Sequence, residues 1–87
     1  MTEKNKEYLK NAIDTLNQLA TNPSTPKNIR KSIQDLANEL TTEEYSMSVR
    51  AANAISTLDD ITQDPNMPSY VRVTLWQAVS ILENIRE

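Results

Sequence analysis

The chain contains 87 residues, carries a formal net charge of −3 and has no glycine, histidine or cysteine. Without Cys and His it can build no zinc finger, iron–sulfur cluster or Ser-His-Asp triad, and without Gly it has no phosphate-cradling loop of the nucleotide-binding type. With 38% apolar and 24% charged residues, it is expected to be one non-enzymatic cytoplasmic domain, residues 1–87, that holds neither a metal nor a cofactor.

The first predicted helix follows a charged start, MTEKNKEYLK, that is not expected to act as a signal peptide. No apolar run approaches the roughly 20 residues that would span a bilayer. Asn22 precedes Pro23, and a residue before proline avoids the α conformation, so this helix should end near residue 21. Apolar residues recur at helical spacing and predict one buried face: Leu9, Ala12, Ile13, Leu16, Leu19 and Ala20.

The second predicted helix begins around Pro26, with Thr25 as its expected N-cap. Its early turns carry Lys27, Arg30 and Lys31, a basic patch that could contact nucleic-acid phosphates. No exposed aromatic residues interleave with this patch, so a solvated helix face is the favoured interpretation and nucleic acid is an unlikely partner. The core stripe of this helix is Ile29, Ile33, Leu36, Ala37 and Leu40.

The third predicted helix starts near residues 42–44, because Thr41 and Glu44 have the spacing of a capping box. Asp64 precedes Pro65, so the helix should end near residue 63. Its core stripe is Ala51, Ala54, Ile55, Leu58 and Ile61. A hydrolase built on carboxylates is the less favoured interpretation of the acidic residues in and around this helix: Glu43, Glu44, Asp59, Asp60 and Asp64.

The fourth predicted helix begins around Pro68, and two of its large apolar residues, Val73 and Trp76, lie away from its core stripe. An exposed tryptophan beside a valine indicates a protein interface, most simply that of a two-fold homodimer. The alternative is that Trp76 caps the core of its own molecule. The core stripe itself is Val71, Leu75, Ala78, Val79, Leu82 and Ile85.

These four helices form two copies of one unit. Residues 11–40 repeat as residues 53–82 at a constant offset of 42, with nine of the 30 aligned positions identical. With their flanks, the repeats span 8–40 and 50–82. Links of about four to six residues force successive helices to lie antiparallel. The fold class is therefore all-α, expected as a four-helix up-and-down bundle, with a two-repeat HEAT-like stack as the alternative.

Both turns place an Asn or Asp eight residues before an arginine. Asn22 precedes Arg30 in the first repeat, and Asp64 precedes Arg72 in the second. Arginine in the first turn of a helix opposes the helix dipole, so each is expected to have a partner. We expect each pair to form a structural link across its turn. The alternative is an anion or carboxylate site that uses both arginines.

Several short motifs lie close together between residues 49 and 77. They are Val49-Arg50-Ala51-Ala52, Ala54-Ile55, Leu58-Asp59-Asp60-Ile61, Asp64-Pro65-Asn66-Met67-Pro68 and Leu75-Trp76. This stretch resembles the signature of a family of small archaeal proteins of unknown function, and residues 26–31 are similar to it as well. The resemblance implies an archaeal source and a helical bundle, and it brings no activity, cofactor or functional residue.

The leading functional hypothesis is a protein-interaction or self-association module that uses Val73 and Trp76. The alternative is a nucleic-acid accessory protein that uses Lys27, Arg30 and Lys31. Neither a small-molecule substrate nor a membrane partner is indicated by the sequence.

Overall fold

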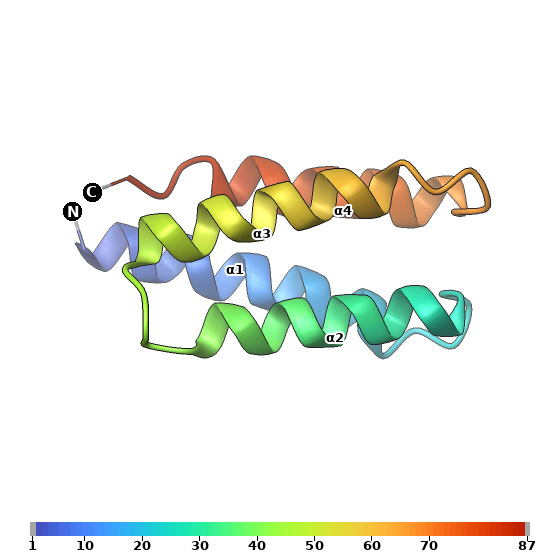
Figure 1. Cartoon of the computed structure of the whole chain (residues 1–87), viewed down its shortest axis with the longest axis horizontal. Coiled ribbons are helices and arrows are strands. Elements are labelled where there is room, and N and C mark those ends of the chain that lie inside the picture. The colour runs from blue at the N-terminus through green and yellow to red at the C-terminus, as the bar shows by residue number, and fades with distance from the viewer. Residues whose placement is uncertain (1, 87) are drawn as a thin grey trace.

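Four α-helices joined by short turns make up the protein (Figure 1). The computed structural model describes residues 2–86. Helix α1 spans Thr2–Ala20, α2 spans Lys27–Thr41, α3 spans Met47–Thr62 and α4 spans Ser69–Leu82. The helices run along the long axis of a body that measures 37 × 18 × 17 Å. The predicted all-α class is confirmed, and the described residues contain no strand.

The order of packing around the bundle identifies its topology. Helix α1 packs extensively against both α2 and α4, α3 packs against α4, and α2 meets α3 along the loosest of these seams. Helices α2 and α4 do not pack against each other, so they lie diagonally across the bundle. A HEAT-like stack would instead pair equivalent helices, α1 with α3 and α2 with α4. The up-and-down bundle is therefore confirmed, and the stacked alternative is wrong.

All four helices contribute to one apolar core. Each presents one stripe of apolar side chains inward, because residues three and four apart lie on one helix face. The predicted stripes supply almost all of the buried residues, and Met67 joins them from the second turn. The most completely buried large side chains are Leu16, Ile33, Leu36, Leu40, Leu58, Leu75, Leu82 and Val71.

The two hairpin turns use the same side-chain device. The Asn22 Oδ1 accepts a hydrogen bond from the Ser24 N–H at 2.9 Å, and the Asp64 Oδ1 accepts one from the Asn66 N–H at 2.9 Å. Such turns need no left-handed residue. No described residue has a positive φ, so the chain reverses direction twice without the glycine that many turns require.

Two predicted helix starts are wrong in detail. The N-cap of α2 is Pro26 itself, with ψ 141°, and Thr25 lies one residue earlier with its side chain buried. Helix α3 begins at Met47, where the Ser46 Oγ accepts a hydrogen bond from the Val49 N–H at 3.3 Å. Thr41 does not cap α3, because it continues α2 and its hydroxyl donates back to the Asn38 carbonyl at 2.6 Å.

Candidate functional site

The outward side of α4 carries large apolar side chains. Val73 is 49% exposed and Trp76 is 53% exposed, opposite the fully buried Val71 and Leu75. Arg72 is the one charged residue between Ser69 and Leu82. We call this surface the α4 face, and its exposed residues are Ser69, Tyr70, Val73, Trp76, Gln77 and Ser80.

The equivalent side of α2 has the opposite character. At the offset of 42, Lys31 stands where α4 has Val73, and Gln34 stands where α4 has Trp76. Helix α2 carries five charged residues within Lys27–Thr41, against the single arginine of α4. The two repeats therefore share a backbone plan while their outward faces have diverged, one toward charge and the other toward apolar surface.

Arg72 holds the second turn together through backbone atoms. Its Nε donates to the Thr62 carbonyl at 3.2 Å, and its Nη2 donates to the Asp64 carbonyl at 3.0 Å. These carbonyls belong to the end of α3 and the start of the turn, where helix geometry leaves acceptors without partners. The structure therefore brings Asp64 and Arg72 together, but through the Asp64 main chain, since the carboxylate is engaged with Asn66.

Arg30 occupies the equivalent place in the first repeat but makes no such bonds. Its Nε is buried and has no acceptor, and its side chain forms no hydrogen bond or ion pair with any other described residue. Asn22 bonds to Ser24 and not to Arg30. The predicted link between Asn22 and Arg30 is therefore absent from the described part of the chain, because the turn satisfies Asn22 internally.

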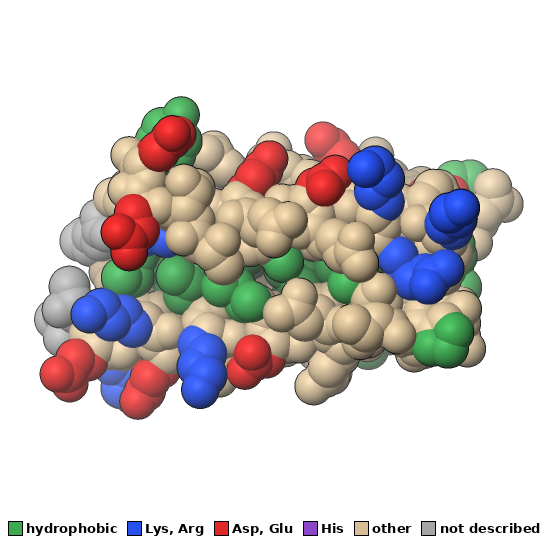
Figure 2. Space-filling model, turned by 90° about the horizontal axis from the view of Figure 1, so that it is seen from below, with side chains coloured by type: hydrophobic (Ala, Val, Ile, Leu, Met, Phe, Trp, Pro, Cys, Tyr) green, Lys and Arg blue, Asp and Glu red, His purple; other side chains and the backbone are tan. Residues whose placement is uncertain are grey.

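A basic depression lies beside Arg30, at the end of the bundle where α2 begins. It has a volume of about 320 Å³. Figure 2 shows Lys and Arg side chains gathered at this end of the α2 side of the molecule. The lining residues are Ala20, Lys27, Arg30, Lys31 and Gln34, so three cations and one amide surround the space and no carboxylate lines it.

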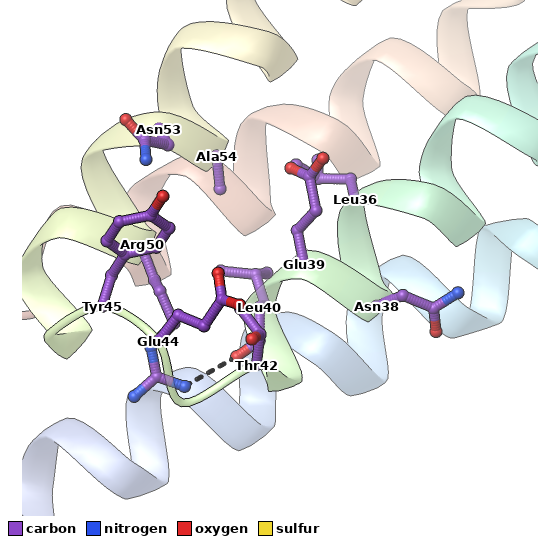
Figure 3. Close-up of a pocket in the computed structure, with 10 residues that line it drawn as sticks. All are labelled: Leu36, Asn38, Glu39, Leu40, Thr42, Glu44, Tyr45, Arg50, Asn53 and Ala54. Carbon is purple, nitrogen blue, oxygen red and sulfur yellow. Dashed lines mark hydrogen bonds between the residues drawn. The ribbon is translucent and has the colours of Figure 1, made fainter.

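A larger pocket of about 510 Å³ lies along the loose seam between α2 and α3 (Figure 3). Arg50 reaches from α3 to the end of α2, where its Nη1 donates to the Leu40 carbonyl at 3.0 Å. That bond satisfies an acceptor that the C-terminus of α2 leaves open. Arg50 is thus committed to joining the two hairpins. The lining residues are Leu36, Asn38, Glu39, Leu40, Thr42, Glu44, Tyr45, Arg50, Asn53 and Ala54.

The acidic residues do not assemble into a metal or catalytic cluster in the part of the chain that is described. Within residues 2–86 no three Asp or Glu side chains are placed to hold a metal ion together. Asp59 and Asp60 are exposed on α3, and Asp64 is used in its turn. Among the same residues, no helix is both long enough and apolar enough to cross a membrane.

Two polar residues have structural roles that the sequence did not reveal. Asn5 is 5% exposed and bonds to the backbone of Arg86 near the other end of the chain. Arg50 joins α3 to α2 across ten positions. Neither residue has an equivalent in the other repeat, where position 47 is Met and position 8 is Tyr. A mismatch between the repeats was the available signal, as it was for Val73 and Trp76.

The chain is similar to archaeal proteins over nearly its whole length. The UPF0147 protein of Metallosphaera sedula is 46% identical over 83 residues, which cover 95% of this chain and 93% of the relative. A crystal structure from Thermoplasma acidophilum, of a protein from the uncharacterized family UPF0147, has a TM-score of 0.89 at 31% identity and covers 97% of this chain and 99% of that one. The crystal structure of MMP1188, a protein of unknown function, has a TM-score of 0.89 at 40% identity and covers 94% and 93%.

The model of an uncharacterised protein family, UPF0147, matches residues 1–85 of the chain. This match extends well beyond the stretch between residues 49 and 77 on which the resemblance rested, and it includes both repeats. The resemblance to a small archaeal family of unknown function is therefore confirmed. The chain belongs to the uncharacterised protein family UPF0147.

Proposed function

We propose that the protein is a non-enzymatic interaction module that self-associates through the α4 face. The observation that carries this proposal is the exposure of Val73 and Trp76, at 49% and 53%, on a helix side that bears no charge. Tryptophan is enriched among residues that dominate binding energy, and a contiguous exposed apolar surface is unusual on a small monomer. An enzyme role has less support, since the described carboxylates form no cluster.

The chemistry of the α4 face suits pairing with a second copy of itself. In a two-fold interface the same surface is used twice, so a charged residue near the axis would meet its own copy. The exposed side of α4 from Ser69 to Ser80 has no charged side chain that would be buried without a partner. Val73 and Trp76 flank the middle of the helix, so two antiparallel α4 helices would place Val73 of one copy against Trp76 of the other.

The size of this surface suggests a modest affinity. A standard stable interface buries about 800 Å² on each partner, which is about a seventh of the 5512 Å² exposed by this chain. A helix of 14 residues is about 21 Å long. The α4 face alone supplies only part of the standard area. We therefore expect a reversible dimer with a dissociation constant on the order of micromolar.

Light scattering coupled to size-exclusion chromatography tests the proposal across a concentration series. The wild-type mass is expected to rise from that of a monomer to that of a dimer. Replacing Val73 and Trp76 with the residues of the first repeat, in the variant Val73→Lys/Trp76→Gln, is expected to abolish that rise. The control is Lys31→Gln on the outward side of α2. A wild-type protein that stays monomeric at about 500 µM, well above a micromolar constant, would contradict the proposal.

The single tryptophan of the chain gives an independent measurement. On dimerisation Trp76 would leave water, so its fluorescence maximum should shift to shorter wavelength as concentration rises. Thermal unfolding of Trp76→Gln, followed by circular dichroism at low concentration, separates the interface from the intramolecular cap. The interface predicts an unchanged monomer stability, because the side chain is half exposed in the single chain. A large loss of stability in that variant would favour the cap.

A further inference from the structure

We propose that the basic depression beside Arg30 is a binding site for a compact phosphate-type anion. Lys27, Arg30 and Lys31 lie within five consecutive residues of α2 and line the same space. Their backbone positions span only about 6 Å along the helix axis, which matches one phosphate group. The lining includes no carboxylate to neutralise them, and the Gln34 amide offers a further donor.

The unused donor of Arg30 supports the same site. Its Nε is buried with no acceptor, and a buried donor without a partner is costly. In the second repeat the equivalent Arg72 spends its donors on the Thr62 and Asp64 carbonyls. The two arginines share their sequence position but not their use. A phosphate oxygen beside Arg30 would supply the acceptor that the first repeat lacks, with the strength of a charge-assisted bond.

The surrounding cations are specific to this repeat. At the positions equivalent to Lys27 and Lys31, the second repeat has Ser69 and Val73. No side chain caps the start of α2, since Pro26 stands at the N-cap. The partial positive charge of that helix end therefore adds to the field of the three side chains. The charge is local, because the chain as a whole carries −3.

The charges that follow along α2 favour a small anion over a nucleic-acid strand. Asp35 lies one turn beyond Lys31 on the exposed side of the helix, and Glu39 follows one turn later. A polyanion that continued along α2 would meet these carboxylates. Extended phosphate backbones are bound by basic surfaces that continue over several contacts. The depression instead offers one cluster of cations that ends within two turns.

Titration with inorganic phosphate and with pyrophosphate at low salt tests this inference. The readout is the backbone amide resonances of the ¹⁵N-labelled protein. We expect saturable shifts centred on residues 27–34. The variant Lys27→Gln/Lys31→Gln is expected to weaken binding about tenfold or more, because two charge-assisted contacts are lost. The matched control is Lys6→Gln/Lys10→Gln, which removes the same charge from exposed positions of α1 and should bind as the wild type does.

A second variant and a second ligand sharpen the outcome. Arg30→Lys keeps the charge but removes the Nε donor, so it should weaken pyrophosphate binding while circular dichroism shows an unchanged fold. Equal weakening in the α1 control pair, or shifts that never saturate, would overturn the proposal. So would single-stranded RNA that binds more tightly as its length increases, since that behaviour identifies an extended nucleic-acid surface. The α4 face plays no part in these measurements.

Discussion

The side chain of Asn5 makes two hydrogen bonds to the backbone of Arg86. The Asn5 Nδ2 donates to the Arg86 carbonyl at 2.7 Å, and the Arg86 N–H donates to the Asn5 Oδ1 at 3.3 Å. One amide thus satisfies a donor and an acceptor of a main chain 81 positions away. It ties the start of α1 to the segment that follows α4, beside the buried Ile85.

Removing this clasp is expected to destabilise the bundle. Asn5→Ala leaves the Arg86 backbone groups without a partner, so the free energy of unfolding should fall by about 1–3 kcal/mol. Urea unfolding followed by circular dichroism measures the change. Asn11→Ala makes the same substitution at an exposed position of α1 and should stay within about 0.5 kcal/mol of the wild type. Equal effects of the two variants would show that the clasp adds nothing.

The two arginines of the repeats should respond differently to the same change. Arg72→Gln loses the bonds to Thr62 and Asp64 and is expected to cost about 1.5–3 kcal/mol of stability. Arg30→Gln removes a donor that has no acceptor and should change stability little, by about 0.5 kcal/mol at most. Chemical denaturation in phosphate-free buffer provides the comparison. A loss for Arg30→Gln as large as that for Arg72→Gln would contradict this difference.

Thr25 offers a route to a more stable protein. Its side chain is 1% exposed and its hydroxyl has no hydrogen-bond partner, while the equivalent position in the second repeat is the buried Met67. Thr25→Val replaces the unpaired hydroxyl with a methyl group of similar size, so stability should rise by about 1 kcal/mol. The measurement is the thermal midpoint. A lower midpoint would indicate that the hydroxyl has a bound water as its partner.

The start of α3 can be tested with two neighbouring hydroxyl residues. Ser46→Ala removes the acceptor for the Val49 N–H and is expected to cost about 1 kcal/mol. Thr41→Ala changes a residue that lies inside α2 and is exposed, so its effect should be close to zero because alanine favours helix. If Thr41→Ala were the more damaging of the two, the cap of α3 would have to be assigned to the capping-box position instead.

Local sequence patterns predicted the helices well, and long-range contacts only poorly. The stripes through Leu16, Leu58 and Leu75 follow from helical periodicity, and the prolines after Asn22 and Asp64 mark the turns. The start of α3 could not be fixed, because several hydroxyl residues between 41 and 48 compete to cap it. The Asn5 clasp depends on residues 81 positions apart, and no pattern along the chain records such a contact.

The candidate sites were predictable only where the repeats differ in residue type. Lys31 against Val73 and Gln34 against Trp76 are visible in an alignment of the two halves. Arg30 and Arg72 are identical in type, so the alignment predicts one role for both. Their different partners arise from how each turn packs against its helix ends, which only the folded structure contains.

The diagonal placement of α2 and α4 determines what a dimer could hold. Because these helices lie on opposite corners of the bundle, two copies joined through α4 would display their basic depressions on the two distant outer surfaces. Such a dimer could not close around a single anion. It would be a bivalent connector that bridges two separate phosphate-bearing molecules, and its apparent affinity for a surface carrying many phosphates would exceed that of one chain through avidity.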